Sequence, residues 1–163
     1  MNLSDLRNGD LLAWRRPSSS GKPAPYMSLV RLLCVSDFGH VSLAWRVNGA
    51  IRHVEATMPR IRVANIPLDA EIFVVPMGLN VSDDEMTQFF ANIIGLRYSI
   101  KDAARGLFGL VAESDDEWQC AEKCLEFFRS RGLAIPDAYT PSRLVRAVMS
   151  TTSRPLIKLN DGF

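Results

Sequence analysis

Short runs with alternating apolar and polar positions fill the first half of the chain. Side chains of a strand point alternately to its two faces, so this two-residue period is typical of a strand with one buried face. The apolar residues between 27 and 34 fit a short helix or a strand equally well. The alternating pattern predicts strands over residues 11–14, 41–47, 51–56, 60–64 and 71–76.

The second half changes to the three-to-four-residue spacing of amphipathic helices. This spacing predicts helices over residues 83–94, 117–131 and 142–149. Ser114 and Glu117 have the spacing of a capping box, Gly132 is typical of a helix end, and Pro141 suits a first helical turn. Residues 151–163 are polar, and we expect a loose tail there.

The order of these elements predicts the fold class. Strands come first and helices second, which indicates an α+β architecture, with a mostly antiparallel sheet packed against helices from the second half. The 163 residues fit a single domain, 1–163, with a core over about 9–150.

Composition narrows the function classes. A net charge of +1 gives no sign of nucleic-acid binding, and no apolar run approaches a membrane span. The first residues lack the apolar segment of a signal peptide, so we expect a cytoplasmic protein, although delivery by another route stays open. Cys34, Cys120 and Cys124 form neither a disulfide framework nor a metal-binding pattern, which indicates free thiols. We expect neither a metal nor a cofactor.

The clearest local signal is a hairpin around Asn48-Gly49, a pair that suits a type I′ turn. Pairing outward from this turn brings His40, Ser42, His53 and Glu55 to one face, with His40 and Glu55 diagonal neighbours roughly 7 Å apart at Cβ. A carboxylate beside an imidazole fixes its tautomer and orientation, as a general base requires. The same pattern also fits a partly exposed polar face, and His53 could be the working imidazole instead.

Cys120 lies in the first turns of a predicted helix. The N–H groups there stabilise a thiolate, whereas Asp115, Asp116 and Glu117 oppose it, so the sign of the pKa shift stays open. Cys124 is expected to be a packed core thiol. Cys120 is either a partly exposed nucleophile or a second buried thiol of that kind.

Six short motifs in order resemble one family over about residues 9–147. That family is the circularly permuted NlpC-like branch of the papain superfamily, the YiiX-type enzymes, with relatives among lecithin:retinol acyltransferase-like proteins. The matching segments are Gly9-Asp10-Leu11-Leu12, Ser36-Asp37-Phe38-Gly39-His40-Val41, Val54-Glu55-Ala56, Gly95-Leu96-Arg97-Tyr98-Ser99, Cys120-Ala121-Glu122 and Thr140-Pro141-Ser142-Arg143-Leu144.

The resemblance implies a permuted papain-like fold and a cysteine hydrolase. Cys120 would be the nucleophile, His40 the base and Glu55 the third member of the triad. Tyr98 and Ser42 would contact substrate, although Tyr98 could equally be an ordinary half-buried aromatic. Backbone N–H groups at the helix start would stabilise the oxyanion.

The implied substrate is a peptidoglycan-type peptide or another amide. The alternatives are a thioesterase or acyltransferase acting on a lipid acyl ester, and a non-catalytic binding module that keeps the fold. One departure is Ala121, where family members often have Ser.

Overall fold

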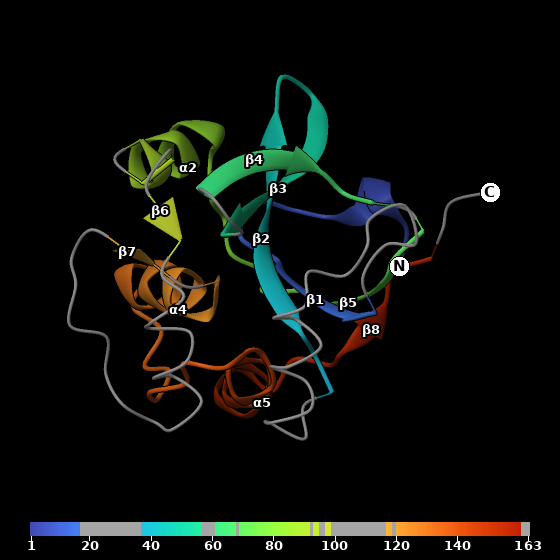
Figure 1. The fold of residues 1–163 in the computed structure, drawn as a ribbon, viewed down its shortest axis with the longest axis vertical. Helices are drawn as coiled ribbons and strands as arrows, with labels where there is room; N and C mark the ends of the chain where they lie inside the picture. Colours follow the sequence, from blue (N-terminus) through green and yellow to red (C-terminus); the bar gives the residue numbers. More distant parts are fainter. Residues whose placement is uncertain are drawn as a thin grey trace.

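Six strands form an antiparallel sheet in the order β4-β3-β2-β1-β5-β8 in the computed structural model, which describes residues 1–16, 37–56, 61–67, 69–91, 93–94, 97–98, 117–118 and 120–160 (Figure 1). β2 lies near the middle of the sheet, between β1 and β3. The strands are β1 (Leu11–Arg16), β2 (His40–Val47), β3 (Ala50–Ala56), β4 (Ile61–Asn65), β5 (Glu71–Val75) and β8 (Ile157–Lys158).

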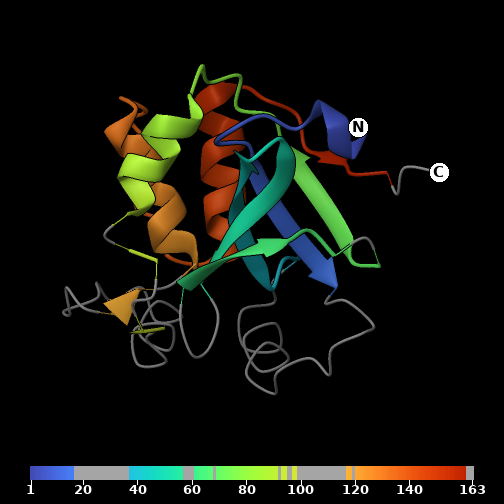
Figure 2. The same cartoon turned by 90° about the horizontal axis from the view of Figure 1, so that it is seen from above.

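The three α-helices within the described residues lie together on one side of this sheet (Figure 2). They are α2 (Asp83–Phe90), α4 (Cys120–Ser130) and α5 (Pro141–Thr152). A short 3-10 helix, η1 (Leu3–Asp5), precedes β1, and β6 (Arg97–Tyr98) pairs in parallel with β7 (Glu117–Trp118). The predicted α+β class and the antiparallel sheet are therefore confirmed.

The start of one helix differs from the prediction. We expected a helix from residue 117, but α4 begins at Cys120 because residues 117–118 pair with β6. Ser114 of the predicted capping box lies outside the described residues, as does the ambiguous segment 27–34. A capping box does begin α2, where the Ser82 hydroxyl accepts from the Glu85 N–H at 3.2 Å.

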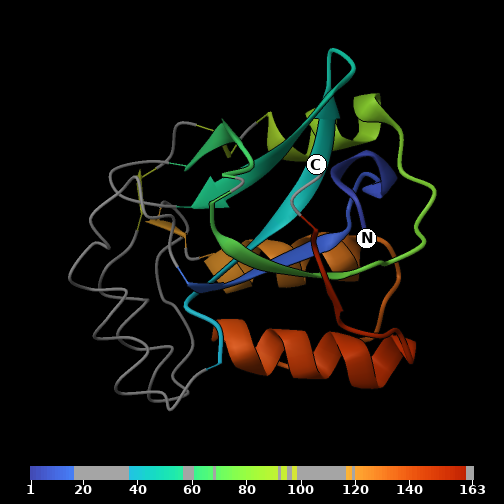
Figure 3. The same cartoon turned by 90° about the vertical axis from the view of Figure 1, so that its right-hand side faces the viewer.

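The expectation of a loose tail over 151–163 is wrong for the residues described there. Residues 151–152 complete α5, and Ile157–Lys158 form β8 against β5. The N–H of Asn160 also donates to the carbonyl of Met1 at 2.8 Å. Figure 3 shows this segment turning back from α5 toward the N-terminus. Main-chain pairing with β5 outweighs the polar composition that suggested a tail.

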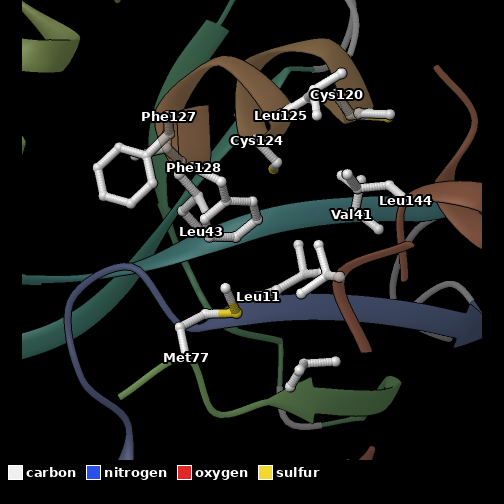
Figure 4. Close-up of a cluster of buried hydrophobic side chains, with 14 of the residues drawn as sticks. Leu11, Val41, Leu43, Met77, Cys120, Cys124, Leu125, Phe127, Phe128 and Leu144 are labelled. Carbon is white, nitrogen blue, oxygen red and sulfur yellow. The ribbon is translucent and has the colours of Figure 1, made fainter. Parts of the chain in front are cut away.

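The two faces of the sheet bury different clusters. One face packs Leu11, Val41 and Leu43 against the helices, and both thiols of α4 belong to this cluster (Figure 4). The other face buries a smaller cluster that includes Leu12 and Trp14. The alternation along β1 and β2 therefore divides their side chains between two cores, as the period of two requires.

Gly9 lets α4 pack closely on the start of β1. Its φ of +82° belongs to the left-handed region, and a Cβ at this position would lie 2.9 Å from Cε1 of Phe127. The Phe127 ring is fully buried on α4. Because α4 also carries Cys120, this close approach helps to set the height of the thiol over the sheet.

Asp10 joins β1 to the end of β5 from inside the fold. Its side chain is 1% exposed, and its two oxygens accept from the N–H of Arg7 at 2.9 Å and of Met77 at 2.8 Å. Burial raises the pKa of Asp10, although both backbone bonds act to lower it. The Gly-Asp motif at the start of the chain is therefore a structural clamp.

We predict that Asp10→Ala lowers the free energy of unfolding by about 3 kcal/mol, because two buried N–H groups lose their acceptor. The matched control is Asp5→Ala, since the exposed Asp5 carboxylate accepts one N–H, from Asn2 at 2.8 Å. That change is expected to cost less than about 1 kcal/mol. Urea unfolding monitored by circular dichroism measures both values, and equal losses would contradict the clamp.

Candidate active site

The hairpin predicted around Asn48-Gly49 is present with the predicted register. Val47 pairs with Ala50, and the ladder continues to Leu43 opposite Val54. Asn48 and Gly49 have φ values of +51° and +78°, as a type I′ turn requires. His40, Ser42 and His53 therefore share one face of the sheet.

Ser42, which we expected to contact substrate, is buried and hydrogen-bonded within the sheet, and its substrate role stays a prediction. It is 1% exposed, and its hydroxyl donates to the carbonyl of Val54. Nδ1 of His53 lies 3.1 Å from the same oxygen. Because the only hydroxyl proton goes to Val54, Nδ1 of His53 must be the donor to Ser42. This hydrogen-bond network assigns the Nδ1–H form to the buried His53 ring.

Trp14 contacts both histidines, which the sequence did not reveal. The centroid of its ring lies 5.1 Å from that of His40 and 4.9 Å from that of His53. The sequence signal for Trp14 was its place at the end of the predicted strand 11–14. Its large buried ring restricts how the His40 imidazole can turn.

Two hydrogen bonds hold the residues that directly precede His40. The N–H of Phe38 donates to the Ser142 hydroxyl of α5 at 3.0 Å, and the N–H of Gly39 donates to the carbonyl of Trp14 at 3.0 Å. Ser142 belongs to the late Thr-Pro-Ser motif and is 4% exposed. The motif thus anchors the segment that leads into β2 and fixes the position of His40.

Cys120 is the first residue of α4 and lies next to the start of β2. The N–H of Val41 is close enough to the thiol to act on its pKa, and Val41 directly follows His40 in the chain. Figure 4 shows Cys120 and Cys124 on α4 over the strand that carries Val41 and Leu43. Cys120 thus approaches β2 from the helix face of the sheet, whereas the His40 ring lies against Trp14, which belongs to the cluster on the other face. A direct contact between imidazole and thiol stays a prediction.

Burial raises the pKa of the Cys120 thiol above its ordinary value, and it outweighs three backbone N–H groups that lower it. These belong to Val41, Ala121 and Cys120 itself, so the predicted effect of the helix start is present but is the smaller one. Cys120 is 8% exposed, so of the two alternatives left open by the sequence its exposure fits the buried thiol. Cys124 is 2% exposed and its pKa is raised further, by burial and by the neighbouring Cys120.

We predict that the alkylation rate of Cys120 by iodoacetamide keeps rising, about tenfold per pH unit, beyond pH 8.5. A raised pKa leaves less thiolate at neutral pH than in a free thiol, so the rate is also lower than that of glutathione at pH 7. Cys124 should react more slowly still. Mass mapping of the alkylated peptides separates the sites, and a rate for Cys120 that levels off below pH 7 would contradict the raised pKa.

The remaining candidates are only partly described. Glu55 pairs with Arg62 across β3 and β4, but its side chain lies outside the described part of the structure. Tyr98 is described only as a backbone position of β6, and Cys34 lies outside the described residues. The contact between His40 and Glu55 and the substrate role of Tyr98 therefore stay predictions.

The described ranges contain neither a metal-binding group of side chains nor a membrane-spanning helix. Among the residues from 1 to 160 that the structure describes, no three His, Cys, Asp or Glu side chains form a group that could hold a metal ion. No helix within these ranges has the length and apolar character needed to cross a bilayer.

The fold of this chain is similar to that of a solved structure, whereas its sequence matches no known family. No protein family matches the sequence, and no curated protein matches it. Among solved structures, metalloprotein yiiX from Escherichia coli O157:H7 is similar, with a TM-score of 0.60 and 12% sequence identity. The match covers 94% of this chain and 89% of that chain. At this identity the likeness concerns the fold alone, and it extends over nearly the whole of both chains.

Proposed function

We propose that the protein is a cysteine hydrolase that cleaves an amide bond through an acyl-thioester on Cys120. The observation that carries the proposal is the position of Cys120, at the first residue of α4 with its sulfur against the N–H of Val41. The next residue back along β2 is His40. A thiol that heads a helix beside a histidine-bearing strand has the components of nucleophilic catalysis.

The raised pKa of Cys120 favours one order of events. A thiol that is protonated at rest must lose its proton during attack, so His40 acts as a general base and not as the partner of a preformed ion pair. The sulfur then bonds to the carbonyl carbon and the amine leaves with a proton from the imidazolium. Water attacks the resulting thioester, the carboxylic acid departs and the thiol is restored.

Backbone N–H groups supply the oxyanion site in this scheme. The N–H groups of Cys120 and Ala121 already act on the sulfur from the helix start. Negative charge develops on the substrate oxygen next to that sulfur, where the same end of α4 stabilises it. The helix start therefore stabilises the oxyanion of the tetrahedral intermediate more than it stabilises the thiolate of the resting enzyme.

His40 is a better base than His53 on the contacts described. Nδ1 of His53 is committed to Ser42, and the ring is 2% exposed. His40 starts β2, one residue before Val41, whose N–H acts on the pKa of Cys120. We assign His53 and Ser42 to the support of the site and His40 to proton transfer.

A burst experiment tests the proposal. Mixing the protein with excess 4-nitrophenyl acetate should release about one equivalent of 4-nitrophenol per protein in a fast phase, followed by slower turnover as water resolves the thioester. A panel of N-acyl amides and peptide amides then separates amide hydrolysis from thioesterase or acyl-transfer activity on lipid esters. If the protein shows no fast phase and turns over no member of the panel, the hydrolase proposal is wrong and the alternative of a non-catalytic binding module with this fold stands.

The third member of the triad has its own prediction. Glu55→Gln should lower the acylation rate by on the order of 10²–10⁴, because the amide keeps the shape of the side chain but loses the charge that stabilises the imidazolium. Single-turnover acylation measures the loss. The matched control is Glu71→Gln, which removes a carboxylate of β5, away from the hairpin. If both variants keep the wild-type rate, another polar residue orients His40.

A further inference from the structure

A cavity of about 370 Å³ lies near the opposite end of β2 from His40. Its walls are residues 6–8, Arg46 of β2, and residues 78–81, which connect β5 to α2. Arg46 is six positions along β2 from His40, which is roughly 20 Å of extended chain. The cavity is therefore separate from the site around Cys120.

Two arginines line this cavity, and a third lies against one residue of its wall. Arg7 and Arg46 line it. Arg154 packs on the cavity wall at Gly78, where a Cβ would lie 2.7 Å from its Nη2 atom. Gly78 has a φ of +61°, so the absence of a side chain serves both the turn and the approach of the guanidinium.

No carboxylate of the described residues lies within ion-pair distance of these arginines, although the buried Asp10 carboxylate interacts electrostatically with Arg7 and Arg154. By contrast, Arg129 contacts Asp137 at 2.6 Å and Arg131 contacts Glu85 at 2.6 Å. Asp10 offsets part of the repulsion among the three like charges. An anion in the cavity would offset more of it.

The donors of the lining arginines have capacity left. Arg46 reaches the carbonyls of Leu6 and Gly49 only at 3.4 Å, beyond the usual 2.9–3.0 Å. A guanidinium carries five N–H donors. Arg7 is exposed, and its side chain makes no hydrogen bond with the residues that the structure describes. Both side chains can therefore turn a donor pair toward a ligand.

The acids nearest the cavity are already engaged. The Asp10 carboxylate accepts the N–H groups of Arg7 and Met77, and Asp83 accepts the Asn8 amide at 2.7 Å. Oδ1 of Asn8 in turn accepts the N–H of Arg46 at 2.7 Å, which fixes the cavity wall.

We propose that this cavity binds a phosphate group, either free or carried by a small molecule. A guanidinium can donate two parallel N–H bonds to two oxygens of a phosphate. A phosphate also carries more negative charge than a carboxylate, so it balances the positive charge of several arginines better. The volume leaves room for a small substituent beyond the phosphate itself.

Isothermal titration at constant ionic strength tests the proposal with inorganic phosphate, glycerol 3-phosphate and acetate. Saturable one-to-one binding of inorganic phosphate supports a free-phosphate site, and binding of glycerol 3-phosphate alone supports a carried phosphate. Acetate should bind at least about tenfold more weakly. Acetate binding as tight as phosphate, or no saturable binding of either phosphate compound, overturns the proposal.

Substitutions locate the site. Arg7→Gln removes an exposed side chain without a described hydrogen bond, so the fold should be kept, while phosphate affinity falls at least about tenfold. Arg46→Lys keeps the charge but loses the paired donors, and it should also weaken binding. The control, Arg143→Gln, removes the same charge from an exposed position on α5. Equal affinity in Arg7→Gln and Arg143→Gln, with unchanged urea midpoints, overturns the assignment.

Discussion

Cys120→Ala should abolish the fast acylation phase, with a residual rate no greater than that of the uncatalysed ester. The proposed mechanism forms its covalent intermediate on this sulfur, and residues that act as a unit lose nearly the whole effect when one is removed. The measurement is stopped-flow release of 4-nitrophenol under single-turnover conditions.

Cys124→Ala is the matched control for this result. Both thiols lie on the same face of α4, one turn apart, and both are buried. Replacing Cys124 leaves a small cavity, with a cost of about 1 kcal/mol in stability and little change in acylation rate. A wild-type burst in Cys120→Ala together with its loss in Cys124→Ala would move the nucleophile one turn along the helix.

His40→Ala should lower the acylation rate by on the order of 10³–10⁴ at pH 7, near the upper end of the range for general bases. The pKa of Cys120 is raised by burial, so the thiol depends on a base to lose its proton at this pH. The deficit should shrink as the pH rises through the thiol pKa, because the thiolate then forms without His40. A pH profile of the single-turnover rate shows this convergence.

His53→Ala separates the two histidines. Both rings contact Trp14, and both are nearly buried, so the two variants disturb similar surroundings. Loss of His53 removes the bond to Ser42 and should reduce the rate less than loss of His40, with no convergence at high pH. The reverse ranking would make His53 the base and leave the reaction class unchanged.

The parts of the fold that follow local rules could be predicted from the sequence. The Asn48-Gly49 turn fixes its own register through positive φ values, and the alternation along residues 41–47 assigns the faces of β2. Long-range pairing could not be predicted in the same way. Residues 117–118 continue a helical pattern in sequence yet pair with β6, and the polar tail forms β8 against β5.

The site shows the same division between local and tertiary information. The sequence placed Cys120 at a helix start and His40 on the hairpin face, because both follow from period and turn chemistry. It could not reveal that Trp14 lies against both histidines, that Ser142 anchors Phe38, or that burial decides the pKa of the thiol. These features depend on how α5 and α4 pack on the sheet, which no short window of sequence encodes.

The most direct test of the proposed mechanism is mass mapping of the protein quenched in acid during the burst. Acid quenching preserves a thioester, and digestion then identifies the cysteine that carries the acyl group. The mechanism predicts one acetyl group, on Cys120, whose occupancy rises with the burst and falls as the ester is exhausted. An acetyl group on Cys34 or Cys124 with none on Cys120, or no acyl-protein at any time, would contradict it.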